Sequence, residues 1–183
     1  MPDSTKVSAS KPAIGGAIYV ESASTSTLPT AADTQITGFN EMGYVSEDGV
    51  VNANTFDSKD IKEWGGATVL PIENNFADKY TLTLIEALNV NVLKEVFGAE
   101  NVTGTLETGI TIKVRPGQHS AKKWIIDTIM RNGAMKRMCI PAGTISSLAE
   151  INYKNDEAVG YKITLTCTPD AEGNTHYEYI KAV

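Results

Sequence analysis

The sequence predicts a mainly β protein: an antiparallel β-sandwich or split barrel with one short flanking helix at about residues 89–97 and a long loop after the first hairpin. Apolar and polar residues alternate with period two in several segments, most clearly over residues 76–85 and 161–168. Turn-forming residues separate these segments. Only residues 89–97 combine helical spacing of apolar residues with helix start and stop signals.

The first predicted hairpin joins residues 43–45 to residues 50–51. Ser46, Glu47 and Asp48 favour a turn, and Gly49 can adopt the positive φ that closes a hairpin. Residues 52–72 then carry only scattered apolar side chains among Asn, Asp, Ser, Lys and Gly. This pattern is too sparse for a core element, so the segment is expected to be a long loop with a function of its own.

The next two elements are a long strand and the helix. Residues 76–85 place Tyr80 and two leucines on one face, although Asp78 interrupts that face near its start. Asn89 can cap the start of the helix, and Gly98 suits the left-handed residue that ends it. The apolar stripe of the helix consists of Val92, Leu93, Val96 and Phe97, which requires a sheet to pack on.

Three of these segments together resemble the major tail tube protein of long-tailed bacteriophages. They are GYVSEDGV at 43–50, DIKEWGG at 60–66 and NVNVLKEVFG at 89–98, with a strand of alternating Thr and Leu before the last. The resemblance covers about residues 14–104. It implies a small β-sandwich with one flanking helix, related in fold to the tube protein of type VI secretion.

The function implied by this resemblance is structural, not enzymatic. The subunit would assemble with copies of itself into hexameric rings, stacked into a hollow conduit for DNA ejection. Tail tip, tape measure and terminator proteins would be its other partners, and DNA would pass without specific binding. The expected location is the virion tail, after assembly in the host cytoplasm.

The resemblance also assigns candidate surfaces. In that family the long loop reaches the neighbouring ring, so the candidate ring–ring interface comprises Phe56, Asp57, Lys59, Asp60, Ile61, Lys62 and Trp64. Aromatic residues are enriched at interface cores, which favours Trp64 as an anchor; the alternative is that Trp64 packs on its own domain. The polar faces of two strands, Thr81, Thr83, Lys162, Thr164 and Thr166, are candidates for the wall of the lumen.

The whole chain, residues 1–183, is expected to form one domain with a flexible N-terminal arm at about residues 1–16 and the long loop at about 52–72. Ala17 to Val20 predict a strand that pairs either with a neighbouring subunit or at an edge of its own domain. The later strands are expected at residues 102–106, 110–114, 124–130, 135–140, 145–153, 161–168 and 177–183.

One of these later strands has a serious alternative. A helix over residues 121–130 would place Trp124, Ile125 and Ile129 on one face. The β-branched residues of the segment and the Asn132-Gly133 turn that follows it favour a strand.

Composition excludes several function classes. The net charge of −6 is the opposite of what a nucleic-acid-binding surface requires. No export signal or membrane span is apparent, so no membrane binding is expected. The sequence contains no recognisable cofactor motif or metal-ligand spacing, so no cofactor or metal is expected. Cys139 and Cys167 are expected to be buried free thiols.

His119 and His176 are expected to be solvated. The alternatives to the tail tube are a tube protein of a contractile phage-tail-like or type VI secretion particle, or a monomeric β-sandwich that binds a ligand.

Overall fold

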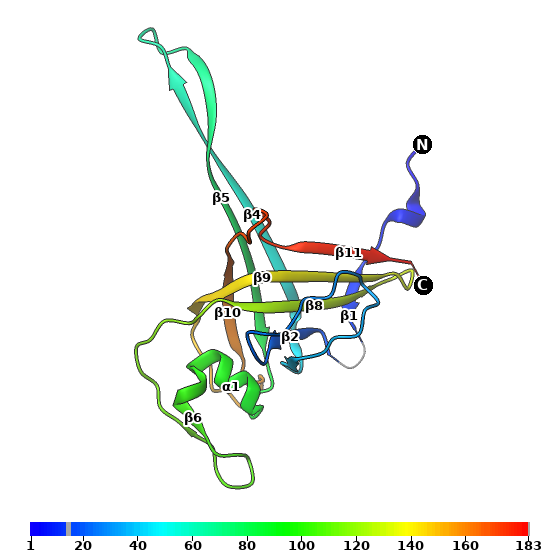
Figure 1. Ribbon diagram of the computed structural model, residues 1–183, viewed down its shortest axis with the longest axis vertical. Helices are drawn as coiled ribbons and strands as arrows, with labels where there is room; N and C mark the ends of the chain where they lie inside the picture. The colour runs from blue at the N-terminus through cyan, green and yellow to red at the C-terminus, as the bar shows by residue number, and fades with distance from the viewer. Residues whose placement is uncertain (14–15, 183) are drawn as a thin grey trace.

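A computed structural model describes residues 1–13 and 16–182, apart from the side chain of Asn74. Residues 14–15 of the expected N-terminal arm and Val183 at the end of the last expected strand lie outside these residues. The described chain is mainly β, as predicted (Figure 1). Its strands are β1 (Ser10–Pro12), β2 (Ile18–Glu21), β3 (Phe39–Glu41), β4 (Val45–Lys62), β5 (Thr68–Leu84), β6 (Val102–Thr103), β7 (Thr111–Ile112), β8 (Lys122–Met130), β9 (Met135–Leu148), β10 (Tyr161–Cys167) and β11 (Tyr177–Lys181); the helices are α1 (Val90–Phe97) and the short 3-10 turns η1 (Ser4–Lys6) and η2 (Ala99–Asn101).

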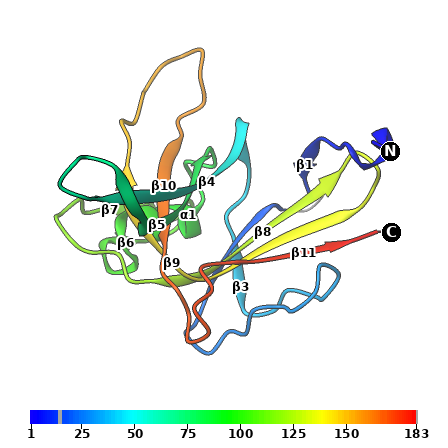
Figure 2. The ribbon, with the colours of Figure 1, turned by 90° about the horizontal axis from the view of Figure 1, so that it is seen from above.

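Nine strands form one antiparallel sheet in the order β3-β2-β8-β9-β10-β5-β4, with β1 also paired to β8 and β11 to β9; β6 and β7 form a separate pair. The long strand β9 connects the two halves of the sheet. Its first residues pair with β8 and β11, whereas its last residues pair with β10. In Figure 2, β8, β9 and β11 therefore run together toward one side of the molecule, away from β10 and β5.

The core lies where α1 and the two halves of the sheet meet. Trp124 is almost completely buried, and its indole N–H donates to the carbonyl of Gly143 at 3.1 Å. A Cβ at Gly143 would lie 2.9 Å from Trp124 Cδ1, so glycine lets the strand approach the ring. Val92, Leu93 and Val96 of α1 complete the core, as the helical stripe predicted.

Both predicted ends of the helix are confirmed. The side chain of Asn89 accepts a hydrogen bond from the backbone N–H of Asn91 at 3.0 Å, and Gly98 follows the last turn with φ 93°. The Asn89 contact satisfies a backbone N–H that the helix itself leaves unpaired.

The prediction of a turn at residues 46–49 and a loop at residues 52–72 is wrong. β4 is one continuous strand that bulges at residues 46–49, where Gly49 has φ 68°, and it stays paired with β5 from Val50 to Lys62. The turn of the hairpin lies instead at residues 63–67. Alternation of apolar and polar residues failed to mark this hairpin because neither of its faces is buried in the domain.

Other expectations need smaller corrections. The strands expected at residues 135–140 and 145–153 are one strand, β9, which ends at Leu148; its bulge near Pro141 accommodates a residue that cannot donate to the ladder. The hairpin expected at 102–106 and 110–114 is reduced to two-residue strands.

Of the remaining strand predictions, the expected edge position or neighbouring-subunit pairing of residues 17–20 is wrong, and the last strand, β11, ends at Lys181. β8 confirms the strand, not the helix, for the segment that begins near Lys122. β2 pairs with β3 and β8 of its own domain, where it is an inner strand.

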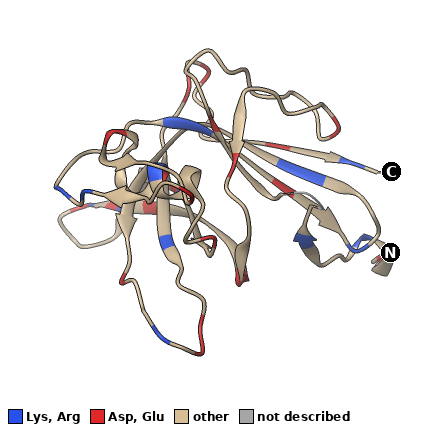
Figure 3. Ribbon diagram, turned by 90° about the horizontal axis from the view of Figure 1, so that it is seen from below, with Lys and Arg blue, Asp and Glu red and all other residues tan. Residues whose placement is uncertain are grey.

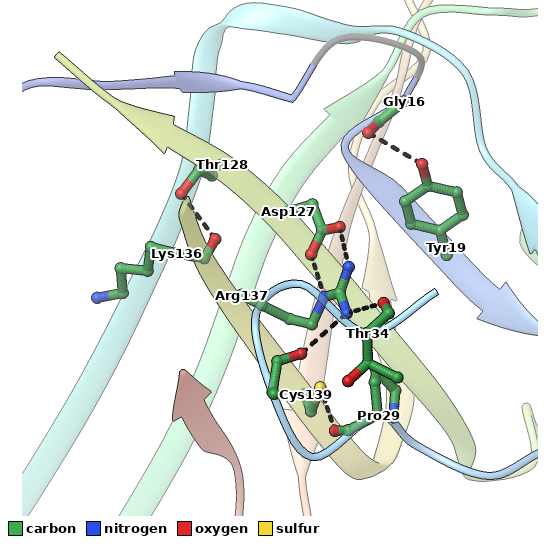
Figure 4. Close-up of polar contacts among 10 residues, drawn as sticks. Gly16, Tyr19, Pro29, Thr34, Asp127, Thr128, Lys136, Arg137 and Cys139 are labelled. Atoms are coloured by element: carbon green, nitrogen blue, oxygen red, sulfur yellow. Dashed lines mark hydrogen bonds and ion pairs between the residues drawn. The ribbon is translucent and has the colours of Figure 1, made fainter. Parts of the chain in front are cut away.

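A buried arginine holds the long connection between β2 and β3 on the sheet (Figure 4). Arg137 donates to both carboxylate oxygens of Asp127 at 2.7 Å, and to the carbonyls of Ala31 and Thr34 at 3.0 and 2.6 Å. The thiol of Cys139 adds a contact to the carbonyl of Pro29 at 3.6 Å. These contacts therefore hold the backbone of the connection on the sheet, although most of its own side chains are exposed to solvent.

Candidate functional site

The outer parts of β4 and β5 form a hairpin that projects far from the rest of the domain (Figure 1). Every described side chain from Val51 to Phe76 is exposed. The tip is a tight turn, in which the N–H of Gly66 donates to the carbonyl of Glu63 at 2.9 Å. The hairpin carries no part of the core, so its residues are available for contact with another molecule.

The projecting hairpin is rich in large apolar side chains. Trp64 at its tip is fully exposed, and the side chains of Phe56 and Phe76 are 67% and 50% exposed. These two rings lie 5.2 Å apart, centroid to centroid. Val51, Ile61, Val69, Leu70 and Ile72 are exposed as well. A monomeric protein rarely displays so many apolar groups together, which marks the hairpin as an interaction site.

A bulge divides the apolar residues between the two faces of the hairpin. Phe56 pairs with Phe76 on the face that continues the core side of the sheet. β5 then contains an extra residue opposite the step from Asp57 to Ser58. Beyond it, period-two alternation places the Ile61–Leu70 pair on the other face. The hairpin thus offers one apolar surface near its base and another near its tip.

All seven residues predicted for the ring–ring interface lie on this hairpin. Phe56, Asp57, Lys59, Asp60, Ile61 and Lys62 are exposed on β4, and Trp64 is in the turn. Trp64 does not pack on its own domain, which removes the alternative considered for it. Leu70 and Ile72 lie within the segment 52–72 expected to reach the neighbouring ring but were not among the seven named candidates, and Phe76 lay outside that segment. Their proximity to β4 depends on the register of the two strands.

The base of the hairpin is held by a buried carboxylate. Asp78 on β5 is buried, and its oxygens contact the side-chain amide of Asn52 at 2.7 Å and Nδ1 of His176 at 2.6 Å. The ring of His176 also packs edge-on against Tyr80. The expectation that His176 is solvated is therefore wrong, because the segment before β11 folds back over β5 and half-buries the ring.

The five residues predicted for the lumen lie together on one face of β5 and β10. Thr81 pairs with Thr164, and Thr83 pairs with Lys162. The hydroxyls of Thr81 and Thr164 are 3.2 Å apart, and Thr166 donates to the hydroxyl of Ser146 at 2.9 Å. The opposite face of these strands packs in the core. This Thr-rich face is a polar surface that also carries Lys162 and, opposite Thr166, Lys79.

Charged residues are spread over the molecule. Figure 3 shows Lys and Arg positions interspersed with Asp and Glu positions along the ribbon. An extended basic surface is what sequence-independent DNA binding requires. The charge pattern therefore does not support tight binding of DNA by one subunit.

The described residues contain no group of three or more His, Cys, Asp or Glu side chains arranged to hold a metal ion. Cys139 and Cys167 are buried and unpaired, as predicted, and burial raises the pKa of each thiol to about 12. No described helix combines the length and apolar character needed to cross a membrane. The hairpin and the Thr-rich face remain as the candidate functional surfaces.

Comparison with known proteins agrees with this picture of a structural component. A family model described as phage tail tube protein matches residues 5–182 of the 183-residue chain. A search of curated proteins finds no match.

Proposed function

The chain belongs to the phage tail tube protein family, and from this premise we propose that it is the repeating subunit of a tube built from stacked, hexameric rings. Family membership makes it a structural component of the virion tail. The observation that carries the proposal of stacking is the projecting hairpin, whose exposed Phe56, Trp64 and Leu70 require a partner surface. A second copy in the next ring supplies that surface.

This ring–ring interface consists of seven residues of the hairpin and the apolar residues opposite them on β5. The seven residues are Phe56, Asp57, Lys59, Asp60, Ile61, Lys62 and Trp64. Apolar groups on both faces suit a hairpin that inserts between neighbours, because each face then loses contact with water. The charged residues among them remain near the rim, where they favour a particular alignment of subunits.

The Thr-rich face, consisting of Thr81, Thr83, Lys162, Thr164 and Thr166, lines the channel. Hydroxyls that bond to one another leave fewer hydroxyls free to hold phosphates, as the Thr81–Thr164 contact illustrates. A wall of this kind allows DNA to pass without specific binding during ejection. By the resemblance to long-tailed phages, the tail is of the long, siphovirus-like type, and the tail tip, tape measure and terminator proteins are the other partners of the tube.

Residues 1–183 act as one domain with the hairpin as its extension; within the arm expected at about residues 1–16, Ser10–Pro12 pair with β8 as strand β1. The buried residues support this, since they form one cluster that extends from Ala17 to Cys167. Assembly takes place in the host cytoplasm before the tail joins the virion.

Excision of the outer hairpin tests the stacking proposal. Residues 58–74 are replaced by Asn-Gly, which joins Asp57 to its partner Asn75 through a two-residue turn. The described side chains removed are all exposed, so the domain is expected to fold. Negative-stain electron microscopy should show tubes for the unaltered protein and none for the excised variant.

The matched control deletes Asn155 and Asp156 from the exposed connection between β9 and β10, and it should still form tubes. Tubes of normal length from the excised variant would contradict the proposal. Should excision abolish the cooperative unfolding transition, the single variants Phe56→Ser and Leu70→Ser address the same point, because both side chains lie outside the core.

A separate experiment tests the lining of the channel. The native thiols are buried, so Lys162→Cys introduces one accessible thiol for a gold-cluster label. Labelled before assembly, the variant should show gold density along the tube axis. Density on the outer wall would refute the assignment of the lumen, without affecting the ring–ring interface.

A further inference from the structure

One residue of β5 places a carboxylate on a face of the strand that is otherwise apolar. Asp78 lies on the same face as Tyr80 and Leu82, and its side chain is 0% exposed. Burial of a carboxylate is costly unless the group is paired, so an apolar residue would serve the core better at this position. The role of Asp78 therefore has to come from its contacts and from its place along the strand.

Asp78 marks the point where β5 leaves the body of the sheet. From Leu84 to Asp78, β5 is paired with β10, and Cys167 at the end of β10 lies opposite Asp78. From Ala77 toward the tip, β4 is the one described strand that pairs with β5. Two-stranded ribbons twist more than wider sheets do. Asp78 is therefore the point at which the hairpin can bend against the domain.

A contact from another part of the sheet reaches Asp78 at this point. β8, β9 and β11, here called the lateral strands, run together in a different direction from the projecting hairpin (Figures 1 and 2). His176 immediately precedes β11, and its Nδ1 contacts Oδ2 of Asp78 at 2.6 Å. Its ring also packs edge-on against Tyr80, with the ring centroids 5.5 Å apart. His176 thus joins the base of the hairpin to the lateral strands.

The turn that leads to His176 is held by its own hydrogen bonds. The carboxylate of Asp170 accepts from the backbone N–H groups of Glu172 and Asn174 at 2.9 and 3.0 Å. It also accepts from the hydroxyl of Tyr177, the first residue of β11, at 2.6 Å. These bonds tie the turn to the start of β11, so the position of His176 is fixed relative to that strand.

The second partner of Asp78 belongs to the hairpin itself. The side-chain amide of Asn52 on β4 donates to Oδ1 of Asp78 at 2.7 Å and to the carbonyl of Lys79 at 3.2 Å. This contact strengthens the pairing of β4 with β5, but it does not connect the hairpin to the lateral strands. The two partners of one carboxylate therefore have effects that can be separated.

We propose that Asp78 is the hinge of the projecting hairpin and that His176 is a positioning residue, which fixes the angle between the hairpin and the lateral strands. With the His176–Asp78 contact in place, the hairpin has one direction relative to the domain. Without the contact, the hairpin swings about Asp78 while the domain stays folded. A fixed direction lowers the entropic cost of binding a partner, because less freedom is lost on contact.

The distance between two spin labels on the unassembled subunit tests this proposal. Lys62→Cys near the hairpin tip and Arg131→Cys in the turn between β8 and β9 provide exposed thiols, whereas the native thiols are buried. Lys62 pairs with Thr68, ten residues from Asp78, so a swing of about 10° moves this label by about 6 Å at ~3.3 Å per residue. Pulsed electron spin resonance should give one narrow distance, and His176→Ala should broaden it by several ångströms.

Three further variants of the labelled protein distinguish the hinge contact from a general loss of stability. Asn52→Ala removes the other partner of the same carboxylate and should leave the distance narrow. His176→Asn should also keep it narrow, because an amide nitrogen replaces Nδ1 as the donor. His176→Phe keeps a ring beside Tyr80 but loses the bond, so it should broaden the distance even where His176→Ala does not fold.

A narrow, unchanged distance in His176→Phe or in folded His176→Ala would overturn the proposal. Equal broadening by Asn52→Ala would overturn it too, because the loss of either partner would then merely loosen the strands. The distances are measured without assembly. The role of His176 can therefore fail while tubes still form, and the proposed function can fail while the role of His176 holds.

Discussion

Replacing Arg137 with methionine is expected to lower the free energy of unfolding by about 3–5 kcal/mol, the usual cost of breaking a buried ion pair from one side. The side chain of Arg137 is 6% exposed and makes four hydrogen bonds. Those to Asp127 raise the pKa of the guanidinium, so the group remains charged. Methionine replaces the aliphatic stem but leaves the Asp127 carboxylate and the carbonyls of Ala31 and Thr34 without their donor.

Urea unfolding of the unassembled protein, followed by far-ultraviolet circular dichroism, measures this loss. With a denaturant slope of about 2 kcal/mol per molar, the midpoint should fall by about 1.5–2.5 M. Amide hydrogen exchange should also show that residues 22–38 lose protection more than the core strands do, because Arg137 is their anchor to the sheet.

Lys136→Met is the matched control on the same strand. Its ion pair with Glu178 is partly exposed, so the variant should lose no more than about 1 kcal/mol. If Arg137→Met and Lys136→Met were equally stable, the assignment of Arg137 as the anchor of this connection would be wrong.

Three further predictions concern single contacts. Cys139 and Cys167 should resist alkylation at pH 8 in the folded protein, and both should react in denaturant. With a thiol pKa of about 12, roughly one in ten thousand of these thiols is deprotonated at pH 8. Rapid labelling of the native protein would contradict the burial of the two thiols. His176→Ala should cost about 1–3 kcal/mol in urea unfolding, since it removes a partner of the buried Asp78 carboxylate, whereas His176→Gln should recover part of the loss; equal stability of all three proteins would refute this role. Asn89→Ala should cost about 1 kcal/mol through loss of the helix cap, and the same assay detects it. Asn89→Ser keeps a capping oxygen while losing, like Asn89→Ala, the amide contact to Glu86, so it should recover most of the loss; equal losses in both variants would argue against capping.

Local patterns in the sequence predicted the elements that have one buried and one wet face. β10 illustrates this, because its residues from Tyr161 to Cys167 alternate between buried and less buried positions as the sequence indicates. Helix α1 was equally accessible, since its cap, apolar stripe and terminal Gly98 all lie within ten residues. In both elements the relevant interactions are set by neighbours along the chain or by a single buried face.

The projecting hairpin could not be predicted in the same way. Its strands are stabilised mainly by backbone pairing with each other, and apolar residues occur on both faces on either side of a bulge. When neither face of a strand is buried, its sequence need not alternate between apolar and polar residues, and a polar segment then resembles a loop. The segment was nevertheless expected to have a function, because a loop of that length is unusual and the resemblance assigns it to the contact with the neighbouring ring.

By itself, the sequence determined that this protein is mainly β, that it has one capped helix, and that it resembles tail tube proteins; the family match and the fold agree. Only the tertiary structure decided that β4 passes through Ser46–Gly49 without turning and that His176 meets Asp78. The reason is physical: these features depend on strand register and on contacts between residues far apart in the chain, which local composition does not encode.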